Sequence, residues 1–489
     1  MKVPILVPKI FNFPFTYDSG SLKNLMPGDI VLVPFGKNEE IGVVWDKIQP
    51  SKKTFKIKKI IKKIDNFKFN KSLIEFINWF SAYNLASKGM VLKMFLGEKK
   101  NVIKIEEQEK NKLVKKSKFL LNKDQQKSLE ALRKFSNKFN VSLLQGVTGS
   151  GKTLVYFERV KEILNLDKQV LILLPEIFLT NQFKERFIEF FGYSPSIWHS
   201  KIGIKSKRKI WQSIIKGNLN LVIGARSSLL LPFKNLGLIV LDEEHDPSYK
   251  QDEGIIYHAR DMAIARASIE NIPIHLVSAV PSLETYNNVK TKKYNHTKLV
   301  SRYRDFPLPE AKVVNLEKAP LRSDQFIADE TLELIDNFIK NKEQVLFFLN
   351  RRGYSPFLIC KKCGFKHLCP NCSIYLTYHK LTNQLICHHC GKKLKKEKTC
   401  SSGKENCDFR MYGPGVEKIY DELKKIFPKK NIKIFSSDFL SKKNETDSIL
   451  KKIEKNEIDI IIGTQLISKG FNFPQLNCIV VVDADFSGM

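Results

Sequence analysis

The segment LLQGVTGSGKTLVYFERV, residues 143–160, constrains the fold of this chain more than any other stretch. An apolar run that predicts a buried strand leads into G-x-x-x-x-G-K-T, and a helical pattern follows, which disfavours a chance match in a loop. Glycines in such a loop let backbone N–H groups surround phosphates, and the N-terminus of the following helix adds its positive end. We therefore predict a nucleoside triphosphate site formed by Gly146, Val147, Thr148, Gly149, Ser150, Gly151, Lys152 and Thr153.

Residues of this loop and two acidic residues farther along the chain predict hydrolysis of the bound nucleotide. Lys152 would reach the terminal phosphates, and the Thr153 hydroxyl would bind Mg²⁺. The segment LGLIVLDEEHDPSYKQ predicts a buried strand that delivers Asp242 and Glu243 at its carboxyl end, where open α/β sheets bind ligands. We predict that Asp242 binds the Mg²⁺ and that Glu243 polarises the attacking water, with a solvated acidic turn as the alternative. The predicted catalytic residues are thus Lys152, Asp242 and Glu243.

The rest of the chain alternates apolar strand-like and helical segments, which predicts two doubly wound lobes. The expected fold class is α/β, with two doubly wound lobes, a small N-terminal β-barrel and a double zinc-binding insertion in the second lobe. The expected domains are 1–97 for the β domain, 98–117 for a charged linker, 118–310 for the ATP-binding lobe 1, 311–357 for the start of lobe 2, 358–410 for the zinc insertion and 411–489 for the remainder of lobe 2.

Eight of the nine cysteines lie between Cys360 and Cys407. In a chain without a secretion signal, repeated C-x-x-C pairs predict zinc ligands, with a disulfide or redox cluster as the alternative. Two such pairs complete one tetrahedral site. His388 or His389 is an alternative to Cys407 as the eighth ligand, and Cys478 is expected to be a core residue. We predict two nested Zn²⁺ sites, an inner one of Cys369, Cys372, Cys387 and Cys390 and an outer one of Cys360, Cys363, Cys400 and Cys407.

The charge balance points to a polyanionic partner. Lys and Arg number 82 against 51 Asp and Glu, a formal net charge of +31. Nucleic acid is the leading candidate, and a lysine-rich, solvated surface is the alternative. The N-terminal segment has prolines inside its apolar run, and the chain has no continuous apolar stretch of about 18 residues. We therefore expect a soluble cytoplasmic protein with no membrane partner.

A series of motifs carries a resemblance that covers nearly the whole chain. In order, they are GVTGSGKT, LLPEIFLT, IGARSSLLLPF, DEEHDPSYKQDEGIIYHARD, NRRGYSP, the paired cysteines and IGTQLISKGFNFP. This order and spacing resemble the bacterial primosomal protein N′ family, the replication-restart DNA helicases of superfamily 2. The resemblance implies an ATP-dependent DNA helicase whose two lobes are RecA-like helicase lobes and which requires ATP, Mg²⁺ and two Zn²⁺.

The resemblance also implies roles for residues around the ATP site. Gln125 matches a glutamine that reads adenine. Residues 246–260 correspond to an aromatic-rich loop that couples DNA contact to hydrolysis, in which Ile255 or Ile256 replaces a common Trp. The family's Ser-Ala-Thr motif reads Ser278, Ala279 and Val280 here, so one hydroxyl is missing. The DNA-contact candidates of the loop are Tyr249, Lys250 and Tyr257.

Residues 1–97 alternate apolar and turn residues as a small β-barrel would. They resemble the family domain that grips the 3′ end of a nascent strand. Phe15 and Tyr17 match its F-x-Y motif, although Thr16 replaces the usual acid, and an ordinary role in the barrel core is the alternative. The charged segment 98–117 is expected to be a linker too short for the winged-helix domain that many relatives carry.

The resemblance implies movement 3′ to 5′ along single-stranded DNA and action at stalled or collapsed replication forks. The partners it implies are forked and single-stranded DNA, the single-strand-binding protein, and primosome proteins that reload the replicative helicase. Two rival classes stay open: a zinc-dependent nucleic-acid-binding module with a vestigial ATP site, and an RNA helicase. DNA-stimulated ATP hydrolysis separates the first rival, and a comparison of RNA with DNA separates the second.

The C-terminal end of the sequence adds one more expectation. The family's last motif, of the type Q-x-x-G-R-x-G-R, follows the strand ending DAD by some tens of residues, and the sequence ends at Met489. Arg351 and Arg352 resemble a different motif and are not expected to replace its arginines. We therefore expect a truncated chain that binds ATP and DNA but hydrolyses ATP slowly, with apolar surface exposed on the strand IVVVDAD.

Overall fold

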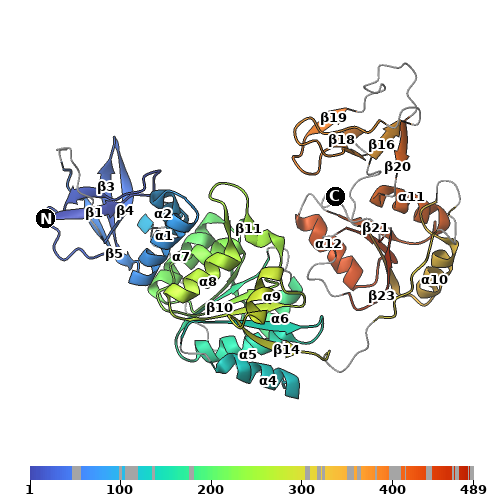
Figure 1. Ribbon diagram of the computed structural model, residues 1–489, viewed down its shortest axis with the longest axis horizontal. Coiled ribbons are helices and arrows are strands. Elements are labelled where there is room, and N and C mark those ends of the chain that lie inside the picture. Colours follow the sequence, from blue (N-terminus) through green and yellow to red (C-terminus); the bar gives the residue numbers. More distant parts are fainter. Residues whose placement is uncertain are drawn as a thin grey trace. The chain divides into compact units, whose positions relative to one another are not determined.

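The computed structural model divides into two compact units, Met1–Leu308 and Pro309–Met489, which are described separately (Figure 1). No helix among the described residues is long and apolar enough to cross a membrane. The described residues are 1–46, 57–98, 102–104, 119–134, 138–175, 181–302, 309–316, 321, 325–349, 357–360, 365–379, 383–395, 409–412, 415–436, 443–464, 467, 473–482 and 484.

The first unit begins with an antiparallel sheet in the strand order β2-β1-β4-β3-β5. Asp18 at the end of β2 pairs with Lys59, just before β5, so the sheet closes on itself as the predicted barrel. Alternate side chains, among them Val31 and Val33, point into the barrel core. The strands are β1 (Lys2–Leu6), β2 (Phe15–Asp18), β3 (Asp29–Phe35), β4 (Asn38–Val44) and β5 (Lys62–Lys68).

Helices α1 (Lys71–Tyr83) and α2 (Lys88–Leu96) join the barrel to the first helicase lobe in one continuous core. Trp211 Nε1 donates a hydrogen bond to the Phe95 carbonyl oxygen over 2.8 Å. The Phe80 ring packs edge-on against Tyr257, with the ring centroids 5.3 Å apart. Val102 in the predicted linker is also buried in this core.

The lobe 1 sheet has seven parallel strands in the order β14-β6-β13-β10-β7-β9-β8, as predicted for a doubly wound lobe. The strands are β6 (Asn140–Gly146), β7 (Gln169–Leu173), β8 (Ser196–Trp198), β9 (Leu221–Gly224), β10 (Leu236–Asp242), β13 (Pro273–Ser278) and β14 (Asn295–Leu299).

Helices cover both faces of this sheet, because alternate strand residues belong to two different core clusters. Residues of α4, α5 and α6 share one cluster, and residues of α7 and α8 share the other. The helices are α4 (Lys123–Arg133), α5 (Lys152–Leu164), α6 (Asn181–Phe191), α7 (Ile204–Lys216), α8 (Ala259–Ile269) and α9 (Leu283–Lys290).

The second unit contains a parallel sheet in the order β21-β22-β15-β23. A cysteine-rich insertion separates β15 from α11, as expected. Of the last strand, Cys478 and Val480 pack on the core, whereas Ile479 and Val481 are 59% and 54% exposed, so the strand exposes apolar surface as expected. The sheet and its helices are β15 (Gln344–Phe348), β21 (Ile432–Phe435), β22 (Ile460–Gly463), β23 (Leu476–Val481), α10 (Asp329–Lys340), α11 (Val416–Ile426) and α12 (Lys443–Glu454).

Candidate active site and metal centre

The phosphate loop lies between β6 and α5, where the sequence predicts it. Gly151, the N-cap of α5, has a φ of 78°, and a Cβ there would lie 2.4 Å from Gln125 Nε2. A Cβ at Gly146 would lie 2.5 Å from Ser150 Oγ. Both positions therefore require glycine, one for its left-handed backbone and for space, the other for space.

The polar groups of the loop fit a triphosphate. Lys152 Nζ donates to the carbonyl oxygen of Gly146 over 2.8 Å and so lies across the loop. Ser150 Oγ is buried and has no hydrogen-bond partner among the described atoms. A buried hydroxyl without a partner is costly, and an acceptor such as a phosphate oxygen would satisfy it.

Gln125 connects α4 to the phosphate loop by a side-chain hydrogen bond. Its Nε2 donates to the Ser150 carbonyl oxygen over 3.0 Å, and its Oε1 accepts from the Asn122 backbone N–H over 3.0 Å as half of a capping box. The side chain is fully buried. Adenine reading by Gln125 stays a prediction, and the structure gives it a second task, which is to support the loop.

Asp242 ends β10, the strand two places from β6 in the sheet, and Glu243 follows it. Asp242 Oδ2 accepts from the Tyr156 hydroxyl over 2.9 Å, and Oδ1 accepts from the Glu243 backbone N–H over 3.0 Å. Burial and the neighbouring Glu243 charge raise the pKa of Asp242 from 3.8 to about 7. Glu243 has a φ of 48°, a rare conformation for a non-glycine residue and one that clusters at functional sites.

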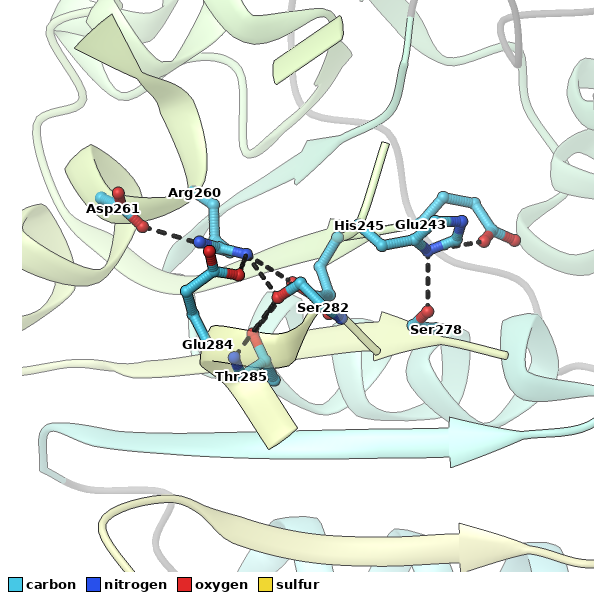
Figure 2. Close-up of polar contacts among 9 residues, drawn as sticks. Glu243, His245, Arg260, Asp261, Ser278, Ser282, Glu284 and Thr285 are labelled. Carbon is cyan, nitrogen blue, oxygen red and sulfur yellow. Dashed lines mark hydrogen bonds and ion pairs between the residues drawn. The ribbon is translucent and has the colours of Figure 1, made fainter. Parts of the chain in front are cut away.

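His245 links this acidic turn to the end of β13. Its Nδ1 lies 2.8 Å from Ser278 Oγ and 3.7 Å from a Glu243 carboxylate oxygen (Figure 2). Within the segment Ser278-Ala279-Val280, the Ser278 hydroxyl therefore contacts His245 of the acidic turn. Val280, at the position of the missing hydroxyl, is 70% exposed.

Glu244 forms a buried polar network that sequence reasoning missed. Its carboxylate accepts from the Ser282 backbone N–H over 2.7 Å and from Thr285 Oγ1 over 2.9 Å, and it pairs with Arg260. Figure 2 labels these three partners. The side chain is fully buried. The only sequence signal was a charged residue next to a buried strand, because the partners lie 16 to 41 residues away along the chain.

The loop 246–260 exposes only one of its three predicted DNA-contact side chains. Tyr249 and Tyr257 are 1% and 2% exposed, whereas the Lys250 side chain is 59% exposed. Base stacking by the two tyrosines stays a prediction that would require the loop to open. Ile256, one of the residues in place of the Trp, is 59% exposed. The loop contains η3 (Pro247–Tyr249), β11 (Lys250–Gln251) and β12 (Tyr257–His258).

In the barrel, Phe15 and Tyr17 have different environments. Tyr17 is 5% exposed in the barrel core, and its hydroxyl donates to the Pro34 carbonyl oxygen over 3.1 Å. Phe15 is half-buried and packs against Phe11 and Phe35, with ring centroids 5.0 and 5.5 Å away. Phe15 is therefore more accessible than Tyr17, which mainly supports the barrel.

The inner cysteines form a metal centre in the second unit. The Sγ atoms of Cys369, Cys372, Cys387 and Cys390 all lie within 4.8 Å of one another, and two of the pairs are 3.5 and 3.3 Å apart. A tetrahedral Zn²⁺ with Zn–S bonds of about 2.3 Å needs sulfurs about 3.8 Å apart, so this cluster fits the ion. A small three-stranded antiparallel sheet lies in the same segment as the four ligands. Its strands are β17 (Thr377–His379), β18 (Gln384–Ile386) and β19 (Lys393–Lys395).

The predicted outer site is described only at Cys360, which is buried at the end of β16 (Phe357–Cys360), paired with β20 (Phe409–Tyr412). Cys363, Cys400 and Cys407 lie outside the described residues, as do Arg351 and Arg352. His388, an alternative ligand, has its Nε2 3.0 Å from His379 Nε2.

Four family models match successive segments of the chain. Residues 2–97 match a 3'DNA-binding domain (3'BD), and residues 122–289 match the DEAD/DEAH box helicase family. Residues 369–395 match the PriA DNA helicase Cys-rich region (CRR) domain, and residues 395–488 match the helicase conserved C-terminal domain.

Known relatives agree with these matches. The replication restart protein PriA of Rickettsia conorii is 42% identical over 488 residues, which cover 98% of this chain and 74% of that protein. PriA of Bacillus subtilis is 36% identical over 379 residues, which cover 77% of this chain and 47% of that protein. Among solved structures, RecG bound to a three-way DNA junction matches with a TM-score of 0.42 and 17% identity, over 74% of this chain and 43% of that chain.

Proposed function

Since the chain belongs to the PriA family of ATP-dependent DNA helicases, we propose that it translocates 3′ to 5′ on single-stranded DNA and restarts replication at stalled or collapsed forks. The helicase domains and the 3′ DNA-binding domain support this proposal. The observation that carries it is the contact of the acidic turn with the loop 246–260, because this contact joins the hydrolytic residues to the segment that, by resemblance, couples DNA contact to hydrolysis.

The chain's own residues would perform hydrolysis as follows. Lys152 exchanges the Gly146 carbonyl for phosphate oxygens, and Ser150 Oγ gains an acceptor. Asp242, in its ionised form, and Thr153 would hold Mg²⁺, and the ion would supply positive charge to the phosphates. Glu243 orients the attacking water, and its neighbour His245 relays the state of the site to Ser278.

The remaining parts would hold the fork. We assign the barrel to the 3′ end of the nascent strand, with the half-buried Phe15 as the aromatic contact, and the cysteine insertion to strand separation. Two Zn²⁺, the inner site and the outer site with Cys360, belong to this proposal. The proposed partners are the single-strand-binding protein and the proteins that reload the replicative helicase. The proposed location is the cytoplasm.

The deciding experiment measures ATP hydrolysis with and without single-stranded DNA, then unwinding of forks that carry either a 3′ or a 5′ tail. We expect DNA to stimulate hydrolysis. Because the proposed movement is 3′ to 5′, we expect only the fork with the 3′ tail to be unwound. ATP binding without DNA-stimulated hydrolysis would favour the non-enzymatic module, and stronger stimulation by RNA would favour an RNA helicase. The expected slow turnover of these 489 residues stays a prediction that the same assay tests.

A further inference from the structure

Two buried tyrosines from separate elements donate hydrogen bonds to Asp242, one to its side chain and the other to its main chain. The Tyr156 hydroxyl donates to the Asp242 carboxylate over 2.9 Å, and the Tyr249 hydroxyl donates to the Asp242 carbonyl oxygen over 2.7 Å. Tyr156 is 0% exposed on α5, and Tyr249 is 1% exposed at the end of η3. The first tyrosine touches the side chain of the predicted Mg²⁺ ligand, and the second touches its main chain.

Both hydroxyls act as donors over the working pH range. Burial raises the pKa of Tyr156 and of Tyr249 well above the usual value of 10.0. A buried tyrosine hydroxyl needs a hydrogen-bond partner, and both tyrosines find it on the same residue. Neither contact is required to bury the ring, because phenylalanine would fill the same space without the bond.

We propose that Tyr156 and Tyr249 are positioning residues for Asp242: Tyr156 orients the carboxylate for Mg²⁺, and Tyr249 transmits the state of the loop 246–260 to it. This inference rests on the proposed helicase function and adds residues that act through Asp242 rather than on the nucleotide.

The case for Tyr156 comes from the two carboxylate oxygens. Oδ2 accepts from Tyr156 and Oδ1 accepts from the Glu243 N–H, so both oxygens of Asp242 have a fixed direction. Tyr156 lies one helical turn after Thr153, the other predicted Mg²⁺ ligand. One helix therefore carries a metal ligand and the group that orients the second ligand.

The case for Tyr249 comes from its neighbours along the chain. Arg226 Nη1 donates to the carbonyl oxygens of Ser248 and Lys250, over 3.0 and 2.6 Å, and so grips the backbone on both sides of Tyr249. The Lys250 side chain is 59% exposed and carries a charge that suits a DNA phosphate. A displacement of this backbone by DNA would reach Asp242 through one hydrogen bond.

Tyr156→Phe tests the first half, with Tyr193→Phe as the matched control because the Tyr193 ring packs against Phe187 and Phe191 in the core. The readout is fluorescence of mant-ATP bound to the full chain, titrated with Mg²⁺, and repeated with Mn²⁺ followed by electron paramagnetic resonance. Loss of a hydrogen bond to a charged group predicts roughly a tenfold rise in the metal concentration at half-saturation for Tyr156→Phe. The control should titrate like the unmodified chain. Equal titrations for all three proteins would overturn this half.

Tyr249→Phe tests the second half by the ratio of DNA-stimulated to basal hydrolysis, together with DNA affinity from fluorescence anisotropy. We expect the ratio to fall about fivefold while DNA affinity stays within about twofold, since one hydrogen bond of about 1 kcal/mol is removed from the coupling path. A purely structural role would lower both rates equally, and an unchanged ratio would overturn the proposal for Tyr249. If the unmodified chain shows no DNA stimulation, the proposed function fails, and the metal titration of Tyr156→Phe still decides the first half.

Discussion

Arg260 Nη1 lies 3.2 Å from Glu244 Oε2, and the two side chains are 9% and 0% exposed. The pair ties the end of the loop 246–260 to the acidic turn, while Tyr249 ties its beginning to Asp242. Arg260 also donates to Ser282 Oγ over 2.5 Å, just after the Ser-Ala-Val segment. Three segments of the site therefore meet on one buried carboxylate, and they cannot move independently of it.

Arg260→Ala should strongly destabilise the first unit. Removal of the cation leaves the Glu244 carboxylate buried without its charge partner, which typically costs about 3 to 5 kcal/mol of unfolding free energy. Urea denaturation followed by circular dichroism measures the loss. Arg133→Ala is the control, because Arg133 is 49% exposed in its pair with Glu162, and a surface pair is worth about 1 kcal/mol or less. Similar losses in the two variants would contradict a special role for the buried pair.

The elements of this site were predictable where the chemistry is local in sequence. The phosphate loop requires Gly146 and Gly151 for space and backbone conformation, so the motif itself specifies the geometry. The strand ending in Asp242 was visible as an apolar run that ends in acids. The inner cysteines were predictable because their spacing matches a tetrahedral metal site.

The environments of Tyr249, Tyr257 and Glu244 were not predictable in the same way. A tyrosine in a polar loop can point outward or inward, and here the loop folds back so that both tyrosines join the core shared with α1. Glu244 and Arg260 lie 16 positions apart, with several short elements between them, so no periodicity relates them. Burial of such groups depends on tertiary packing, which residue type alone does not specify.

Lys152→Ala should abolish ATP hydrolysis and leave DNA binding largely intact. The ammonium contacts the Gly146 carbonyl in the phosphate loop, and it would stabilise charge on the transferring phosphoryl group. DNA affinity depends on phosphate contacts at the other basic side chains of the chain. Hydrolysis assays and anisotropy with a labelled oligonucleotide measure the two activities. A parallel loss of both would count against the assignment of Lys152 to the nucleotide.

Zinc removal should unfold the cysteine insertion and leave the first unit intact. Four sulfurs within 4.8 Å would repel one another as thiolates without a cation, so the small strands around them depend on the metal. Cys387→Ser should release one Zn²⁺ per chain, measured by mass spectrometry of the metal content. Metal analysis that gives two Zn²⁺ for the unmodified chain would support the outer site, and a value of one would remove it.

Phe15→Ala should weaken binding to a DNA junction with a free 3′ end more than to one with a blocked 3′ end. An aromatic ring that stacks on a base contributes about 1 to 3 kcal/mol. Tyr17→Phe is the control, since the Tyr17 hydroxyl is used inside the barrel on the Pro34 carbonyl. If Phe15→Ala binds both junctions as tightly as the unmodified chain does, Phe15 is excluded from the contact.

The raised pKa of Asp242 should make both the stability of the folded chain and its affinity for Mg²⁺-nucleotide depend on pH. The affinity should rise with pH through neutrality. Burial and the Glu243 charge raise the folded-state pKa of Asp242 to about 7, whereas 3.8 is its ordinary value. Without metal, the folded chain therefore keeps a proton that the unfolded chain releases, so this group's contribution to stability is present below about pH 4 and declines between about pH 4 and 7.

Metal binding has the opposite dependence on pH, because Mg²⁺ requires the ionised carboxylate and competes with that proton. Calorimetry of Mg²⁺-nucleotide binding between about pH 6 and 8, in buffers of different ionisation enthalpy, should detect release of about half a proton near pH 7. Asp242→Asn removes the titrating group and should abolish this release. Asp246→Asn is the comparison, because the Asp246 carboxylate accepts the Ser248 N–H outside the metal site. Proton release that persists in Asp242→Asn would assign the titration to another residue and leave Asp242 ionised throughout.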